Sequence, residues 1–543
     1  MNSIPEQATH APAYAPVDPI TVEVIGSALS SIVEEMGETL VRASHSTNIK
    51  ERRDCSTAIF TRGGETLCQA EHIPMHLGSF LEIIPHILKR FPYSVIRPGD
   101  VFIGNDAFEG GGTHLPDIVL AEPIFIDGEV FAWAMNTAHH SDFADRGHAH
   151  IYQEGLRIPP IRLYREGVLQ EEIQSLILLN CQVPRERVSD LRAQSAANRL
   201  GVQRLQSLCE KYGVGVVAAA GAALMDYAER KMRVGIAAIP DGTYTFEDVF
   251  DNPEIDGHLD FACSITVSGD EMHLTFDAPP QLRAGINMTH TALLSTVYYA
   301  VKSVIDPTIL PNAGLARPIK VTAPPGSVLS CIHPAAVFGR IGPCQRVVDL
   351  IHGALAKIIP ERLGGASCGT CMTASFIGNH PESGDIWIYI ETIGGGAGAR
   401  ATKDGLNGVH VHMTNTSNLP VEALEVEYPL TVLRYDLAEG SAGDGQYRGG
   451  MGLRRVYRAE TPCRLELDTS RLRSSPWGLA GGGDAARAQL VYGAGVEAFV
   501  RGAGALQSGQ TVGIVTPGGG GFGLVADRDP QAVQADIADG VIG

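Results

Sequence analysis

The chain has 543 residues with a formal net charge of −19, and this acidic balance argues against binding to nucleic acid or to an anionic membrane. Its length is more than one hydrophobic core supports, so we expect roughly two to four domains. The 44% hydrophobic content is ordinary for a globular protein, and the 10 cysteines lack a disulfide-scaffold spacing, which predicts reduced thiols and a cytoplasmic location.

The N-terminal segment 1–17 is rich in Ala and Pro and contains no Lys or Arg. This composition matches neither a secretory signal nor a transit peptide, and we expect a disordered lead-in. Asp18 and Pro19 then predict the start of a helix, because Asp is a favoured N-cap and Pro suits the first helical position. Ile25 and Leu29 begin a row of apolar residues at helical spacing.

A hairpin is predicted around the Asp-Gly turn at 127–128, because two β-branched and aromatic runs, 118–126 and 129–135, flank it. A hairpin returns the chain to its starting point. Asp117 precedes the first run and His139 follows the second, so both residues are expected at the same end of the ribbon.

The register of this hairpin decides whether Asp117 and His139 share a face. A two-residue turn would pair Asp117 with Ala138 and turn His139 to the other face. A three-residue loop with a bulge would pair Asp117 with Thr137 and put His139 diagonally across the same face, within reach of a long side chain. We predict the bulged hairpin.

A metal site is predicted at this end of the ribbon. His114 lies three residues before Asp117, in an extended loop, because Pro116 keeps the preceding residue out of helical geometry. Two imidazoles and one carboxylate with open coordination positions suit a divalent zinc, manganese or iron ion. The predicted ligands are therefore His114, Asp117 and His139, and the alternative is a polar strand end with solvated histidines. Further polar candidates follow in the sequence: His140, Asp142, Asp145, His148 and His150.

Other polar residues have less specific surroundings. His72 and His76 flank Pro74, which disfavours a helical metal pair at this spacing, so we expect two loop histidines beside a pocket, with a structural role as the alternative. Asp190 and Gln194 lie in the first turns of a predicted helix and are interpreted as surface or interface residues unless the pocket reaches them.

The order of elements predicts a mixed α/β, multi-domain chain of the α+β class. A metal-bearing catalytic region is expected at 18–239, with a long helical segment at 185–238. A middle α+β region follows at 240–360. The C-terminal region, 361–543, is predicted to be mostly β, because short strand patterns alternate there with glycine-rich turns.

Three motifs resemble cofactor sites without their context. The glycine runs 394–398 and 518–523 look like nucleotide loops, but neither is followed by Lys-Ser/Thr or lies in a clear strand–helix unit, so tight β-turns are the better interpretation. Cys368 and Cys371 have metal or redox spacing, but neither a second pair nor a thioredoxin-like unit accompanies them.

Short motifs with a fixed order run through nearly the whole chain, from Asp18 to Gly523. They are Glu51-Arg52-Arg53-Asp54-Cys55-Ser56, His72-Ile73-Pro74-Met75-His76-Leu77-Gly78-Ser79, Gly112-Thr113-His114-Leu115-Pro116-Asp117, His139-His140-Ser141-Asp142, Asp190-Leu191-Arg192-Ala193-Gln194, Thr414-Asn415-Thr416-Ser417-Asn418, Pro420-Val421-Glu422, Glu427-Tyr428-Pro429-Leu430, Tyr447-Arg448-Gly449-Gly450-Met451-Gly452 and Thr516-Pro517-Gly518-Gly519-Gly520-Gly521. With these motifs the chain resembles the hydantoinase B/oxoprolinase family, the B-type subunits of ATP-dependent hydantoinases, lactamases and acetone-type carboxylases.

The resemblance implies a division of labour within a hetero-oligomer. An A-type partner subunit of the actin-like class would bind ATP and phosphorylate a carbonyl or lactam oxygen, and this B-type chain would carry the metal and complete the reaction. The resemblance also implies that His114, Asp117 and His139 are the metal ligands, the same residues that the hairpin argument brings together.

The implied chemistry assigns roles to further residues. Phosphorylation of an amide oxygen gives a reactive imidate-like ester, and a divalent metal lowers the pKa of a water that can attack its carbon. His140, His76 or Asp142 would take or return the proton, the imidazoles being suited to neutral pH.

We therefore predict a subunit of an ATP-dependent cyclic-amide hydrolase that opens a hydantoin, 5-oxoproline or lactam ring. The alternative is a subunit of an ATP-dependent acetone- or acetophenone-type ketone carboxylase, although the compact chain favours the hydrolase. A third interpretation is a scaffold with a structural metal, but such a site is closed by four protein ligands and only three are assigned.

Overall fold

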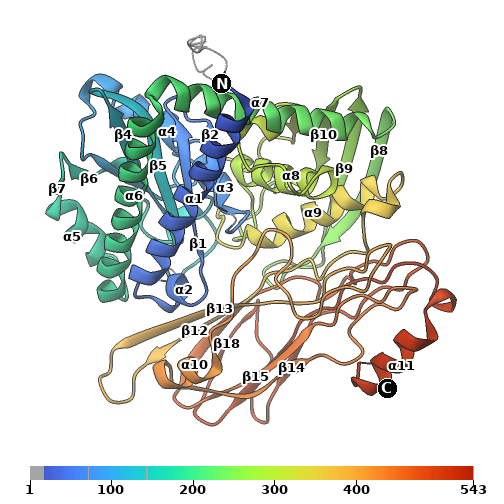
Figure 1. Cartoon of the computed structure of the whole chain (residues 1–543). Coiled ribbons are helices and arrows are strands. Elements are labelled where there is room, and N and C mark those ends of the chain that lie inside the picture. Colours follow the sequence, from blue (N-terminus) through green and yellow to red (C-terminus); the bar gives the residue numbers. More distant parts are fainter. Residues whose placement is uncertain (1–16, 71, 142–144, 542–543) are drawn as a thin grey trace.

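The computed structural model describes residues 17–70, 72–141 and 145–541, so the lead-in predicted for 1–17 lies outside the described residues except at its last position. Figure 1 shows two α/β regions side by side above a β region formed by the C-terminal part of the chain. The mixed α/β, multi-domain architecture predicted from the sequence is confirmed.

The N-terminal region is a seven-stranded antiparallel sheet between two layers of helices (Figure 1). Across the sheet the strands are β2 (Thr66–Gln69), β1 (Cys55–Thr61), β5 (Glu129–His139), β4 (Asp117–Ile126), β3 (Val101–Gly104), β6 (Ile161–Arg165) and β7 (Val168–Leu169). The helices are α1 (Pro19–Ala43), α2 (Thr47–Lys50), α3 (His76–Phe80), α4 (Ile83–Arg90), α5 (Glu171–Leu179), α6 (Pro184–Tyr212) and α7 (Val214–Ala237).

The strand alternation explains the two helical layers. Ile59 of β1 packs in one core with α1, α6 and α7, whereas its neighbour Phe60 packs in another with α3 and α4. α1 begins as predicted, since the Asp18 side chain accepts a hydrogen bond of 3.0 Å from the Thr21 backbone and Pro19 opens the helix. No single described helix is long and apolar enough to cross a membrane, and α6 and α7 meet that test only as a pair bent by 108°.

The β4–β5 hairpin has a different register from the predicted one. Its turn has two residues, Asp127 and Gly128, and both have positive φ. Such a turn is favoured in hairpins because its twist matches that of the flanking strands. A bulge further along adds Phe131 to β5 and shifts the pairing, so that Asp117 lies directly opposite His139. The predicted three-residue loop, with Asp117 opposite Thr137, is therefore wrong, but the bulge does put Asp117 and His139 on one face.

The middle region is a four-stranded sheet covered by two helices. Its strand order is β11 (Ile319–Thr322), β10 (Glu271–Asp277), β9 (Leu259–Ser268) and β8 (Gly242–Phe250), with β11 parallel to β10 and the other pairs antiparallel. Helices α8 (His290–Ile305) and α9 (Ile341–Leu355) bury their apolar sides against this sheet in one large core.

The C-terminal region contains two four-stranded antiparallel sheets that pack face to face. One has the order β13 (Ile386–Ile393), β12 (Met372–Asn379), β16 (Cys463–Asp468) and β18 (Ala503–Leu506), and the other β14 (Leu430–Leu437), β15 (Leu453–Ala459), β19 (Thr511–Val515) and β17 (Gln489–Tyr492). Phe376 from the first sheet and Tyr457 from the second share the buried core. Two short helices, α10 (Val421–Glu427) and α11 (Pro530–Ala538), complete the region.

The two glycine runs lie against each other in this region. The Gly396 amide donates to the Pro517 carbonyl (3.0 Å), and the Ala399 amide donates to the Gly520 carbonyl (2.9 Å). Glycine is required because the backbones approach so closely that a Cβ at Gly519 would lie 2.1 Å from the Ala397 carbonyl oxygen. The runs therefore pack backbone to backbone, and the predicted tight β-turns are wrong for both. A third segment also packs here, since a Cβ at Gly449 would lie 1.7 Å from the Gly519 carbonyl oxygen.

Candidate metal centre

Three side chains meet at the end of the β4–β5 hairpin: those of His114, Asp117 and His139. One nitrogen or oxygen atom from each lies within 4.8 Å of the others. His114 Nε2 and Asp117 Oδ1 are 3.2 Å apart, and neither atom makes a hydrogen bond to any described residue. Two ligands of a tetrahedral zinc ion, each bound at about 2.1 Å, are roughly 3.4 Å apart, so this donor set fits a divalent ion.

Hydrogen bonds orient both histidine rings. His114 Nδ1 lies 2.9 Å from the Phe338 carbonyl oxygen, so it donates there and leaves the lone pair of Nε2 free for the cluster. His139 Nδ1 lies 2.8 Å from the Asn48 amide nitrogen, which leaves Nε2 as the nitrogen that can face the cluster. Such outer contacts hold metal-binding imidazoles in position.

Asp117 is anchored through only one of its two oxygens. Arg340 donates to Asp117 Oδ2 (2.8 Å) and, through Nε, to Thr113 Oγ1 (2.9 Å). Burial alone would raise the pKa of Asp117, but the adjacent His114 ring and Arg340 guanidinium hold that pKa well below its usual range, so the carboxylate is ionised. Burial lowers the pKa of both His114 and His139, which favours the neutral imidazoles that a metal requires.

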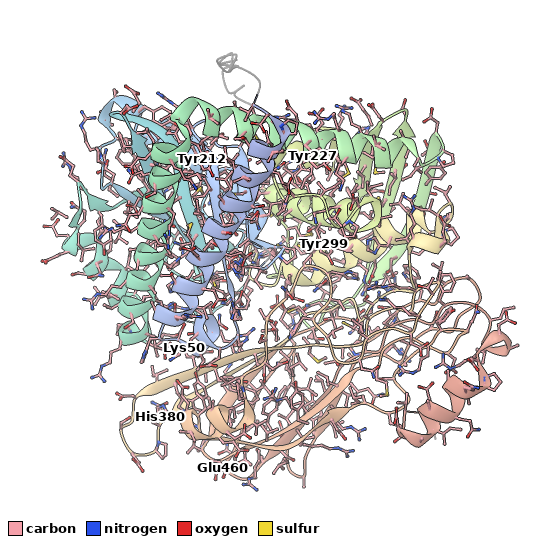
Figure 2. The ribbon with its side chains drawn as sticks, viewed as in Figure 1. Lys50, Tyr212, Tyr227, Tyr299, His380 and Glu460 are labelled. Atoms are coloured by element: carbon pink, nitrogen blue, oxygen red, sulfur yellow. The ribbon has the colours of Figure 1, made fainter. Side chains whose placement is uncertain are left out.

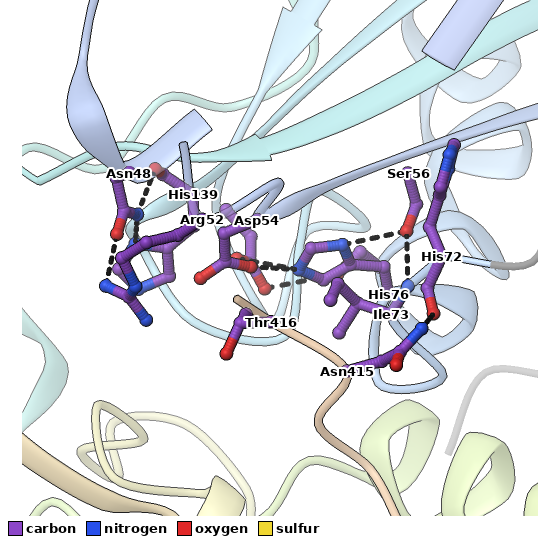
Figure 3. Close-up of polar contacts among 12 residues, drawn as sticks. Asn48, Arg52, Asp54, Ser56, His72, Ile73, His76, His139, Asn415 and Thr416 are labelled. Atoms are coloured by element: carbon purple, nitrogen blue, oxygen red, sulfur yellow. Dashed lines mark hydrogen bonds and ion pairs between the residues drawn. The ribbon is translucent and has the colours of Figure 1, made fainter. Parts of the chain in front are cut away.

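His76 and Asp54 stand beside this cluster (Figure 3). His76, the first residue of α3, places Nε2 3.5 Å from Asp117 Oδ1 and 3.6 Å from Asp54 Oδ1, and its Nδ1 contacts Ser56 Oγ at 3.0 Å. Burial raises the pKa of Asp54. Asp54 was not predicted as a site residue. It directly precedes β1, the strand that pairs with β5 next to His139.

The cluster opens into a cavity of about 70 Å³ at the junction of the three regions. The N-terminal region supplies Arg52, Asp54, Ile73, Met75, His76, His114 and His139; the middle region supplies Phe338, Arg340 and Ile341; and the C-terminal region supplies Cys371, Thr373, Ile390, Thr392, Met413, Thr414, Thr416 and Asp468. Arg52 reaches across the junction, where it donates to the Ile390 carbonyl (2.6 Å) and to Thr392 Oγ1 (2.8 Å).

A wider cavity of about 430 Å³ adjoins the first, since Ile73 and Thr414 line both. His72 lines this second cavity, not the one at the cluster. Figure 2 places Tyr299, another of its lining residues, near the centre of the molecule where the regions meet.

The remaining predicted residues lie elsewhere. His140 is fully buried outside the cavity lining, and its two ring nitrogens contact Gln194 Oε1 (3.0 Å) and the Arg187 guanidinium. Asp142 lies outside the described residues. Asp190 and Gln194 are buried, not superficial as expected, because the Asp190 carboxylate accepts from backbone amides before α2 and Gln194 bonds to β4 and β5.

The comparisons with known proteins agree with this architecture. Residues 18–525 match the family model of hydantoinase B/oxoprolinase. The chain is 33% identical to the B-type subunit of a putative D-/L-hydantoinase from Pseudomonas sp., over 97% of this chain and 93% of that protein. It superimposes on the crystal structure of ATP-dependent caprolactamase from Pseudomonas jessenii with a TM-score of 0.88 and 29% identity, covering 97% of this chain and 95% of the other.

A second solved structure, nucleotide-free acetone carboxylase, has the same fold at 19% identity, with a TM-score of 0.85 over 97% of this chain and 78% of that one. The family model matches nearly the whole sequence and confirms the family resemblance that the ordered motifs indicated. This chain belongs to the hydantoinase B/oxoprolinase family.

Proposed function

We propose that this chain is the metal-bearing B-type subunit of an ATP-dependent hydrolase that opens a hydantoin, 5-oxoproline or lactam ring. An A-type partner with an actin-like ATP site would first phosphorylate the carbonyl oxygen of the ring amide. The supporting observation is the cluster of His114, Asp117 and His139, in which two ligand atoms without a hydrogen bond to any described residue lie beside a cavity. The hydantoinase and caprolactamase names of the relatives point to the same substrate class.

Zinc or manganese is the proposed ion, with iron as a third candidate, because imidazole and carboxylate ligands suit all three. When bound, the ion would supply a water of lowered pKa. His76 lies between Asp54 and Asp117 at the cavity wall, and of the predicted proton carriers that the structure describes, His76 and His140, it is the one that lines the cavity. His140 is left out of this role because its ring faces Gln194 and Arg187.

Two guanidinium groups suit this cavity to a phosphorylated substrate. Arg52 and Arg340 both line it, and Arg52 Nε has no hydrogen bond to a described residue. An anionic phosphoryl group is favoured beside such cations. Thr392 and Thr416 add hydroxyl groups to the opposite wall, where they contact each other at 2.7 Å.

A ketone carboxylase is the second candidate function. Its support is the shared fold with acetone carboxylase, because a metal-bearing cavity with cationic walls suits the activation of a ketone as well as of a lactam. The chemistry of the reacting partner, water or an activated carbonate, separates the two functions.

The test combines the purified chain with its A-type partner, ATP and a divalent metal. We expect ring opening of hydantoin, 5-oxoproline or caprolactam, measured as the released amino acid, together with phosphate release from ATP. The control is the same complex with Asp117→Asn, which should keep the partner and lose ring opening. Bicarbonate-dependent acid formation from a ketone, with no ring opened, would establish the carboxylase instead.

A further inference from the structure

A row of three charged side chains on β16 ends at the cavity. Arg464, Glu466 and Asp468 alternate with Leu465 and Leu467, whose side chains belong to the sandwich core, so the charged residues share the opposite face of the strand. At the outer end of the row, Arg464 pairs with Glu466 at 2.9 Å. Asp468, at the inner end, lines the cavity that contains the metal cluster.

Asp468 is held in place by its neighbours. The Asn252 amide donates to its Oδ1 at 2.8 Å. Its Oδ2 lies against the backbone of Gly339, where an added Cβ would be 2.5 Å away. Thr373, the residue paired with Asp468 across β12 and β16, lines the same cavity wall. Asp468 therefore reaches the cavity from the C-terminal sandwich, whereas Asp117 belongs to the cluster at the end of the N-terminal sheet.

The surroundings of Asp468 favour its protonated form. Burial and the nearby Glu254 raise the pKa of Asp468 to about 7, even though Asn252, His148 and Arg340 act in the other direction. Asp54, the other carboxyl group that lines the cavity, also has its pKa raised by burial. Asp117, in the cluster beside the cavity, has its pKa held well below the usual range by His114 and Arg340. The ionised carboxylate of Asp117 thus belongs to the metal cluster, whereas Asp468 brings to the cavity a carboxyl group that holds a proton near neutral pH.

We propose that Asp468 is the general acid that protonates the ring nitrogen as the carbon–nitrogen bond breaks. This inference rests on the proposed function, since it concerns the opening of a phosphorylated cyclic amide. It gives the C-terminal sandwich a chemical role in addition to closing the cavity.

Protonation of the ring nitrogen decides whether the carbon–nitrogen bond or the carbon–oxygen bond to phosphate breaks. Addition of water to the ring carbon that bears the phosphorylated oxygen leaves that carbon with a hydroxyl group, the phosphate oxygen and the ring nitrogen. When the carbon–nitrogen bond breaks, its electron pair stays on nitrogen, which takes the proton of Asp468, while the hydroxyl group loses its proton to water and becomes a carbonyl. A second water then splits the resulting acyl phosphate into carboxylate and phosphate, and Asp468 regains a proton from solvent.

Without this acid the competing bond breaks. Phosphate is a good leaving group, whereas an unprotonated amine is a poor one. Cleavage of the carbon–oxygen bond to phosphate re-forms the original amide, so ATP is used and no ring is opened. A general acid at the nitrogen therefore couples ATP hydrolysis to ring opening.

The test compares Asp468→Asn with the wild-type chain, each assembled with the A-type partner and assayed for phosphate and for opened ring. We expect ring opening to fall by about 10²-fold, the usual contribution of a positioned acid. Phosphate release should persist, so that the ratio of phosphate to opened ring rises by a similar factor. The wild-type kcat should fall as pH rises through the pKa of Asp468, and the variant should lose that dependence.

The matched control is Glu466→Gln, the same type of change two residues away on the same face, paired with Arg464 and outside the cavity lining. It should keep the wild-type ratio and pH profile, and both variants should keep the wild-type metal content. Asp468→Asn with wild-type coupling, or with phosphate release and ring opening lost together, would overturn the inference alone. A wild-type complex that carboxylates a ketone and opens no ring would overturn the proposed function and, with it, this inference.

Discussion

Two buried carboxylate–guanidinium pairs, one in the N-terminal sheet and one in the C-terminal sandwich, have different surroundings. Asp117 pairs with Arg340 at 2.8 Å, and Glu391 pairs with Arg455 at 2.7 Å. Both oxygens of Glu391 accept hydrogen bonds, Oε1 from Arg455 and from Asn418 (2.9 Å) and Oε2 from the Tyr457 hydroxyl. Asp117 Oδ1 instead lies beside two imidazoles without a hydrogen bond to a described residue.

The difference fits a structural role for Glu391 and the proposed ligand role for Asp117. A buried carboxylate is tolerated only when its hydrogen-bonding capacity is met, because the desolvation penalty is otherwise several kcal/mol. In the sandwich, both oxygens of the Glu391 carboxylate have hydrogen-bond donors within the protein. At the hairpin, Asp117 Oδ1 would gain its partner from the proposed cation, and this contrast can be tested by changing each pair separately.

The largest effect is expected from His139→Ala. Loss of one of three ligands should reduce ring opening to background and metal content to that of the metal-stripped protein, without unfolding the chain. Metal analysis, turnover and circular dichroism measure these results. His258→Ala is the control, because this half-exposed histidine lies outside the cavity lining and should change none of the three. Retained turnover in His139→Ala would contradict the proposal that His139 is a metal ligand.

Gly449→Ala should disrupt the C-terminal region while leaving the cluster residues unchanged. Its Cβ would overlap the Gly519 carbonyl oxygen at 1.7 Å, so the segment around Gly449 must move away from the 518–523 run. We expect a large drop in soluble yield and in the midpoint of thermal unfolding. Gly215→Ala, in α7 with no atom near the added Cβ, should stabilise the chain by about 0.5–1 kcal/mol. Equal stability of the two variants would contradict the packing role of Gly449.

Glu391→Gln tests the ion pair with Arg455 in the C-terminal sandwich. Removing one charge leaves the Arg455 guanidinium without its counter-charge in the sandwich core, and this should lower the free energy of unfolding by about 3–5 kcal/mol. Chemical denaturation measures the loss, and the metal content of the folded protein should not change. Glu460→Gln, at a partly exposed ion pair with Arg458, should cost about 1 kcal/mol or less. A metal loss in Glu391→Gln would show that the two pairs do not act independently.

A third buried carboxylate, Glu122 of β4, should give the smallest effect. Burial raises the pKa of Glu122 to about 7, with only a partial offset from Arg199. In the unfolded chain this carboxyl ionises near its ordinary pKa, so folding loses stability as pH rises from that value toward 7.

Glu122→Gln should therefore be more stable than the wild-type chain at pH 8, by about 1–3 kcal/mol, and equally stable at pH 4, where Glu122 is protonated in both states. Denaturation curves at the two pH values measure the difference. A variant that is less stable than wild type at pH 8 would show that the ionised Glu122 has a stabilising partner in the folded chain.

The features that sequence patterns predicted are local. The start of α1 follows from Asp18 and Pro19, and the hairpin follows from its Asp-Gly turn and its apolar runs. The register was predicted wrongly because a single bulge at Phe131 shifts every pairing beyond it, and no residue type in the sequence marks that bulge. The order of motifs was enough to recognise the family.

The sequence by itself brought His114, Asp117 and His139 together, because a hairpin makes residues at its two ends neighbours in space. Only the tertiary structure decided what faces them. Arg340 reaches Asp117 across a separation of 223 residues, and Asp468 reaches the same cavity from a different sheet. Local periodicity carries no signal for contacts between regions, since they depend on how separately formed layers pack, and so the open oxygen of Asp117 and the proton-holding carboxyl of Asp468 became visible only in the assembled fold.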